Sequence, residues 1–155
     1  MQFTQPEGTH VAHFNWATLV GDLGSPEVAG FENAVDRVNA LAERSPGFVW
    51  RLGSEMEAAH AAGWPMFTEN PRVIASFSVW KAPAGFTEYV YKTVHGAFFR
   101  RRAEWFVPGS GGHVLWWVPA GHIPDVTEAR ARLERLQAEG PSEEAFTTAE
   151  VRGNA

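Results

Sequence analysis

The segment from residue 84 to residue 106 carries the side chains best suited to chemistry. Its apolar residues recur with a helical period, and steps of about 100° per residue bring a set of them to one broad face of the predicted helix. This face presents Tyr91, Val94, His95, Phe98, Arg102 and Trp105. An imidazole, a phenol and a guanidinium among apolar carbons are typical of a small-molecule site.

His95 is the candidate catalytic residue of this face. As a neutral imidazole in an apolar pocket it would act as a general base, or as an axial ligand to a haem iron. A core histidine whose ring nitrogens bond to backbone or to a carboxylate is the alternative. Arg102 would hold a substrate carboxylate or a haem propionate, or it would pair with Glu88 or with a carboxylate near the C-terminus.

Two further polar side chains lie on the first predicted strand, residues 9 to 20. Strand alternation places His13 and Asn15 on the same side. We expect both to serve as catalytic donors that orient a substrate beneath His95.

The other histidines give no metal motif. His10 and His13 point to opposite faces of the strand, because they lie three residues apart. His113 and His122 flank the fourth predicted strand without a supporting carboxylate pattern. We therefore predict no metal site other than a possible haem at His95, and no nucleophile elbow, phosphate loop or dinucleotide fingerprint.

Aromatic residues are unusually frequent: the chain of 155 residues has seven Trp, eleven Phe and two Tyr. Most of them are expected to fill the core. Seven Trp exceed what a small core requires, so part of the set is expected to line a cavity or a subunit interface. We predict that Trp80 and Trp117 contact the substrate together with Tyr91, Phe98 and Arg102.

Composition excludes several other classes of protein. Without cysteine there is no disulfide framework, thiolate nucleophile or iron–sulfur cluster. No apolar run approaches the about 18 residues of a membrane span, and residues 1 to 8 lack a signal-peptide stretch, so we expect no membrane partner and a cytoplasmic location. The net charge of −5 makes nucleic acid a poor partner despite the run Arg100 to Arg102.

The predicted elements follow the order β-α-β-β-α-β with an extra C-terminal helix. Strands are expected at 9–20, 48–52, 72–80 and 113–118, and helices at 25–45, 84–106 and 125–140, the last with Asp125 as N-cap. Residues 54–71, with a helical patch at 55–62, form a long connection that is a lid or a plain insertion. We predict one domain over residues 9–148, with loose termini at 1–8 and 149–155.

This order predicts an α+β, ferredoxin-like fold, in which both crossover helices cover one face of an antiparallel sheet. The strands are apolar on both sides, so the second face also needs a cover. We therefore predict that it packs against a second copy of the chain, as a homodimer.

Several motifs together resemble a known family. They are Gly30-Phe31, Asn39 to Ala42, Ser45 to Arg51, Ser78-Val79-Trp80, His95 with Arg101 to Phe106, Trp116 to Gly121, and Glu128 to Leu136 with Gly140-Pro141 and Ala145 to Thr147. Over about residues 10 to 147 the chain resembles a bacterial domain-of-unknown-function family in the dimeric α/β-barrel superfamily, which includes the antibiotic-biosynthesis monooxygenases. The resemblance implies a dimeric α/β barrel better than it implies a reaction.

The same resemblance implies two kinds of oxidative site. Some relatives are cofactor-free monooxygenases, and others degrade haem with an Asn on the first strand and a Trp and a His on the second helix. Asn15 and His95 correspond to these by location, and Tyr89 follows Trp80 where that branch also has an aromatic. His95 falls about one helical turn before that branch's ligand histidine, so no cofactor and haem both remain open.

The sequence thus predicts an oxidoreductase of monooxygenase type that acts on a small apolar or aromatic molecule. Two alternatives stay open. One is a non-oxidative isomerase, cyclase or lyase of a biosynthetic pathway that uses His95 as acid or base. The other is a protein that binds haem or an apolar ligand without turnover.

Overall fold

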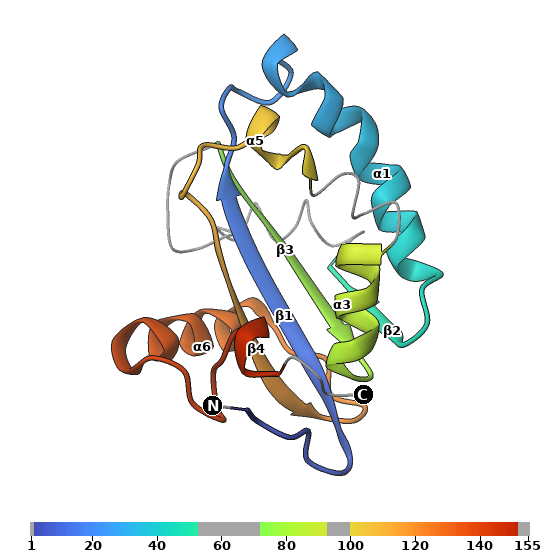
Figure 1. Cartoon of the computed structure of the whole chain (residues 1–155), viewed down its shortest axis with the longest axis vertical. Helices are drawn as coiled ribbons and strands as arrows, with labels where there is room; N and C mark the ends of the chain where they lie inside the picture. Colours follow the sequence, from blue (N-terminus) through green and yellow to red (C-terminus); the bar gives the residue numbers. More distant parts are fainter. Residues whose placement is uncertain (1, 53–71, 93–99, 152–155) are drawn as a thin grey trace.

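A four-stranded antiparallel sheet in the order β2-β3-β1-β4 organises the molecule (Figure 1). The structure, a computed structural model, describes residues 2–52, 72–92 and 100–151. The strands are β1 (Thr9–Thr18), β2 (Phe48–Arg51), β3 (Val73–Trp80) and β4 (Gly112–Pro119). The helices are η1 (Pro26–Val28), α1 (Ala29–Glu43), α3 (Pro83–Lys92), α5 (Arg102–Trp105), α6 (Val126–Glu139) and η2 (Thr148–Glu150). This order and topology confirm the predicted α+β, ferredoxin-like fold with an extra C-terminal helix.

Strand β1 lies in the middle of the sheet and pairs along its length with β3 and β4. Its residues alternate between two apolar cores, as expected for a strand that is covered on both faces. Val11 packs in the core beneath α1 and α3, whereas Ala12 and Phe14 pack in the core on the opposite face.

The core between the sheet and helices α1 and α3 is rich in aromatic rings. Trp80 stacks on Tyr89, with ring centroids 5.3 Å apart and an interplanar angle of 29°. Phe48 meets Trp80 edge-on at 5.5 Å. Gly85 lets α3 approach the loop before β2, because a Cβ there would lie 2.8 Å from the Pro46 carbonyl oxygen. This core fixes the two helices over one end of the sheet.

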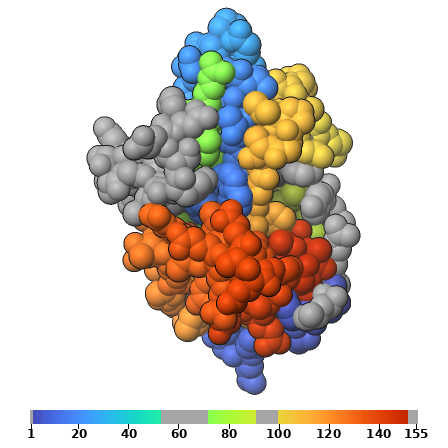
Figure 2. Space-filling model, turned by 90° about the vertical axis from the view of Figure 1, so that its left-hand side faces the viewer, coloured from blue at the N-terminus to red at the C-terminus, as the bar shows by residue number. Residues whose placement is uncertain are grey.

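The opposite face of the sheet is covered in part by α6 of the same chain. Ala129 and Leu133 of α6 pack on strand residues such as Phe77 and Trp116, which are 1% and 0% exposed. Figure 2 shows α6 in orange across the lower half of the molecule on this side. Helix α6 therefore buries apolar surface on the face that was predicted to pack against a second copy, and the homodimer stays a prediction.

Helix α6 begins as predicted. The Asp125 side chain accepts a hydrogen bond from the Glu128 backbone N–H at 2.9 Å, which is an N-cap. Glu128 also accepts the indole N–H of Trp116 at 2.7 Å. The start of α6 is thus tied directly to the sheet.

The chain ends, predicted to be loose, each have an apolar side chain packed in the core. Phe3 is 6% exposed and Val151 is 3% exposed. The Phe3 N–H donates to the Glu150 carbonyl oxygen at 2.7 Å, so the two end segments lie against each other. Their apolar side chains complete the core beneath α1 and α3, which corrects the prediction.

The single helix predicted over residues 84–106 is interrupted. Helix α3 ends at Lys92, and Arg101 lies in a turn before the short helix α5. Phe106 then has an extended backbone. The predicted face from Tyr91 to Arg102 runs through residues 93–99, which lie outside the described residues, so it stays a prediction. The predicted patch 55–62 and the connection 54–71 also lie outside the described residues.

Within the described part of the chain, no helix is both long and apolar enough to cross a membrane.

Candidate functional site

Polar side chains form two adjacent rows across the strands, on the face that α1 and α3 cover. In the first row Asn15 of β1 lies between Ser76 of β3 and His113 of β4. In the second row His13 lies between Ser78 and Leu115. Directly opposed residues of antiparallel strands project to the same side. We refer to Ser76, Asn15, His113, Ser78 and His13 as the polar rows.

Asn15 has one end of its amide fixed and the other available. The Ser76 hydroxyl donates to Asn15 Oδ1. Asn15 Nδ2 has no hydrogen-bond partner among the described residues. Asn15 is half-buried, and Ser76 is exposed although it lies in the middle of a strand. The Asn15 amide and the Ser76 hydroxyl are therefore at least partly accessible on this face of the sheet.

His13 lies at the side of the polar rows nearest α3. It is 6% exposed, and its ring centroid lies 4.2 Å from that of Phe86. The His113 ring centroid lies 6.1 Å away from it. Both residues predicted on β1, His13 and Asn15, thus project to the same face and lie next to each other in the polar rows.

His113 is a member of this cluster that the sequence analysis passed over. The Thr148 backbone N–H donates to His113 Nε2 at 3.1 Å. Burial lowers the pKa of His113, and the nearby Glu150 carboxylate offsets this only in part. The ring is therefore neutral near pH 7, with its proton on Nδ1. Strand alternation places His113, Leu115 and Trp117 on one side of β4, but whether that side is the one His13 occupies depends on the register between β1 and β4.

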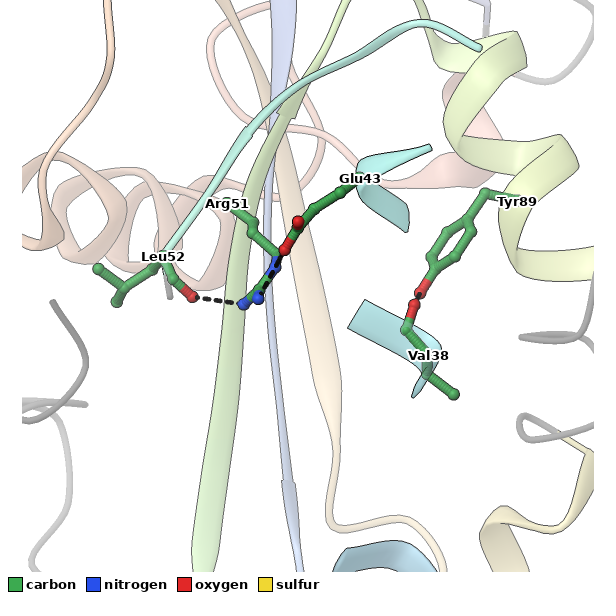
Figure 3. Close-up of polar contacts among 5 residues, drawn as sticks. All are labelled: Val38, Glu43, Arg51, Leu52 and Tyr89. Atoms are coloured by element: carbon green, nitrogen blue, oxygen red, sulfur yellow. Dashed lines mark hydrogen bonds and ion pairs between the residues drawn. The ribbon is translucent and has the colours of Figure 1, made fainter. Parts of the chain in front are cut away.

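Tyr89 and Arg51 mark the end of the site toward β2 (Figure 3). The Tyr89 hydroxyl donates to the Val38 carbonyl oxygen at 3.1 Å and pins α3 to α1. Burial raises the pKa of Tyr89, so its phenol stays neutral. Arg51 pairs with Glu43 at 2.8 Å and donates to the Leu52 carbonyl oxygen at 3.4 Å. The Tyr89 hydroxyl and the Arg51 guanidinium thus bond to other groups of the same chain.

The two tryptophans predicted to contact the substrate have different surroundings. Trp80 is 1% exposed, and its Nε1–H donates to the Ser78 hydroxyl at 3.0 Å. It therefore supports the site from within the core and has no open ring face for a ligand. Trp117 is half-buried, and Phe146 of the C-terminal segment lies 4.8 Å from it between ring centroids.

The remaining predicted residues lie on the segment after α3. His95 and Phe98 fall outside the described residues, and so does the side chain of Tyr91, whose backbone belongs to α3. Arg102 is exposed at the start of α5. The proposed grouping of His95, Tyr91 and Arg102 stays a prediction.

The predicted haem ligand His95 lies outside the described residues, so a haem at that residue stays a prediction. His113 Nε2 already accepts the Thr148 N–H and is not available as a ligand. Across residues 2–52, 72–92 and 100–151, no three His, Cys, Asp or Glu side chains lie close enough to share an ion. A surface depression beside α6, lined by Glu128, Ala131, Arg132, Arg135 and Glu144, is open and charged and lies away from the polar rows.

Sequence comparison assigns a family. Residues 10–154 match the family described as a domain of unknown function, DUF3291. The chain belongs to the DUF3291 family. No curated protein matches the sequence.

Two solved structures are similar to this DUF3291 chain. A protein of unknown function from Nitrosomonas europaea, NE2512, is 13% identical with a TM-score of 0.50, over 77% of this chain and 99% of that one. SnoaB from Streptomyces nogalater, a cofactor-independent oxygenase, is 18% identical with a TM-score of 0.47, over 75% of this chain and 98% of that one. The first likeness supports the ferredoxin-like fold and says nothing of a reaction.

Proposed function

We propose that this protein is an enzyme that acts on a small apolar or aromatic molecule bound over the polar rows. The observation that carries the proposal is the state of Asn15. Its amide has an unused N–H donor, in the middle of a sheet, beside the exposed hydroxyl of Ser76. At this open position a polar group of a ligand can replace water as the partner of the Asn15 N–H donor.

The surroundings favour an aromatic ligand with at least one polar group. The buried rings of Phe86 and His13 pack on each other with centroids 4.2 Å apart, and they give the side of the polar rows nearest α3 an aromatic character. Apolar walls with few fixed donors are the usual composition of a small-molecule site. In such a site the apolar walls bind the ring, and the Asn15 amide orients the polar group.

We propose oxidation by dioxygen as the reaction. Hydrogen bonding to a substrate oxygen stabilises negative charge as it develops there, and the effect is strong where water is excluded. An aromatic ring made electron-rich in this way can react with dioxygen directly. The ring loses two hydrogen atoms and gains one oxygen atom, the other oxygen atom leaves as water, and dioxygen is the only oxidant.

The test uses 1,5-dihydroxynaphthalene as probe, with tryptophan fluorescence to measure binding and an oxygen electrode to follow turnover. We expect saturable binding, oxygen uptake and formation of a coloured quinone, with at least about a tenfold loss in Asn15→Ala, since one hydrogen bond to a charged group is worth about 1.5–3 kcal/mol. Ser142→Ala, on the segment after α6, is the matched control. A bound probe recovered unchanged in air would refute turnover and favour a binding protein, and a rearranged probe without oxygen uptake would favour an isomerase.

A homodimer is part of the proposal. The fold class implies pairing through the sheet face, and the partly buried Trp16, Trp50 and Leu52 lie on the same face as α6. Light scattering coupled to size-exclusion chromatography should give twice the chain mass of 17.1 kDa. A mass of one chain at micromolar concentration would refute the pairing and leave the site proposal intact.

A further inference from the structure

Asn15 and His113 are a directly opposed pair on β1 and β4. The Cβ atoms of such a pair lie about 4.5–5.5 Å apart and project to the same side of the sheet. A ligand atom above the two strands is therefore within reach of both side chains.

Each of these side chains is held at one end by a neighbour. Ser76 on β3 donates its hydroxyl hydrogen to Asn15 Oδ1, and the Thr148 N–H donates to His113 Nε2 at 3.1 Å. Ser76 lies on β3, on the side of β1 away from β4, whereas Thr148 belongs to the segment that pairs with the outer edge of β4. The two groups that hold Asn15 and His113 therefore lie on opposite sides of this pair. The nitrogens left over are Asn15 Nδ2 and His113 Nδ1.

Both leftover nitrogens are donors. Neither has a hydrogen-bond partner within residues 2–52, 72–92 and 100–151. Because Nε2 of His113 accepts a bond, the proton of its neutral ring must be on Nδ1. The titratable groups next to His113 are His13, at 6.1 Å between rings, and Glu150, whose carboxylate accepts the Thr147 N–H at 2.7 Å.

We propose that Asn15 and His113 together bind one oxygen atom of the ligand, a phenolate or enolate oxygen that carries negative charge. The C-terminal segment has a positioning role, because the Thr148 N–H selects the tautomer of His113 that donates toward the ligand. This inference rests on the proposed function, since it names the ligand atom that the same site binds. Two fixed donors stabilise an oxygen anion more than a neutral oxygen, so the pair favours the ionised ligand.

The experiment measures the pKa of 4-nitrophenol bound to the full chain, because its phenolate and phenol have different visible spectra. 4-Nitrotoluene has a similar shape without the oxygen and reports on the apolar walls alone. We expect the bound phenol to ionise at lower pH than the free phenol. Asn15→Ala and His113→Phe should each raise the bound pKa by about one unit, which is a tenfold loss of phenolate preference, and should leave the affinity for 4-nitrotoluene within about twofold. His122→Phe is the matched control and should change neither value.

The outcomes separate this inference from the proposed function. If both probes bind but the bound phenol ionises as it does in water, or if the two variants do not shift it, the donor pair is refuted and the ligand site stands. If neither probe binds, both proposals fail.

A measurement on the unmutated protein covers the case in which a variant does not fold. Nitrogen-15 spectra of the histidine rings should show His113 protonated at Nδ1, with Nδ1 and the Asn15 amide shifting on addition of 4-nitrophenol. A ring protonated at Nε2, or signals that do not move at saturation, would overturn the inference.

Discussion

The contact between Glu128 and Trp116 should be a main support of α6 on the sheet. Trp116 is fully buried, and its Nε1–H donates to Glu128 Oε2 at 2.7 Å. Removing the carboxylate with Glu128→Ala leaves this indole N–H without an acceptor. An unsatisfied buried donor costs about 1–3 kcal/mol. The Glu128 side chain is 26% exposed, and water reaching the indole N–H would lower this cost, so we expect a loss near the middle of the range, about 2 kcal/mol.

The second partner of Glu128 contributes much less. Glu128 Oε1 lies 2.8 Å from His122 Nε2, but the His122 side chain is 46% exposed. Exposed pairs of this kind contribute about 0–1 kcal/mol. We therefore expect His122→Ala to cost less than about 0.5 kcal/mol, and Glu128→Gln, which keeps an acceptor oxygen, to cost less than about 1 kcal/mol.

Urea unfolding followed by tryptophan fluorescence measures these differences, and a double-mutant cycle with Trp116→Phe isolates the contact. The coupling between Glu128→Ala and Trp116→Phe should be about 1–2 kcal/mol. For a chain of this size a loss of about 2 kcal/mol lowers Tm by about 4–8 °C. A loss below about 0.5 kcal/mol in Glu128→Ala, or additive effects in the cycle, would refute the reasoning that the buried indole depends on this carboxylate.

Three further predictions concern the site and its supports. The pKa of His113 is lower in the folded chain than the usual 6.5, so the unfolded chain takes up a proton first as pH falls. The contribution of His113 to the free energy of unfolding should therefore be constant above pH 6.5 and decrease below it. Urea unfolding at several pH values should show a smaller pH dependence in His113→Gln, and an equal dependence in both proteins would contradict the assignment. Gly85→Ala should destabilise the protein by about 1–3 kcal/mol, although alanine favours helices, because the new Cβ would lie 2.8 Å from the Pro46 carbonyl oxygen; a gain in Tm would show that the loop moves freely. Tyr89→Phe should lower the free energy of unfolding by about 1 kcal/mol, because the Val38 carbonyl loses its 3.1 Å hydrogen bond. The alkaline ultraviolet difference spectrum should show that Tyr89 does not ionise while the chain is folded. Unchanged stability and an ordinary phenol titration would contradict its burial.

The sequence placed side chains within one strand correctly, whereas neighbours on different strands could not be placed from it. Alternation alone places His13 and Asn15 on the same face, and the structure agrees. His113 was passed over because its link to Asn15 depends on the register between β1 and β4, which no local pattern specifies. The helical face from Tyr91 to Arg102 stays a prediction, because residues 93–99 lie outside the described part of the chain.

By itself the sequence determined the order of the elements, the ferredoxin-like topology and the N-cap at Asp125, because hydrophobic period and capping depend on residues close together in the chain. Only the tertiary structure decided that Phe3 and Val151 are core residues, that α6 shares in covering the second face, and that a backbone N–H from the C-terminal segment fixes the proton of His113. Burial and hydrogen-bond partners depend on segments far apart in the sequence, and their positions are set by packing of the whole chain.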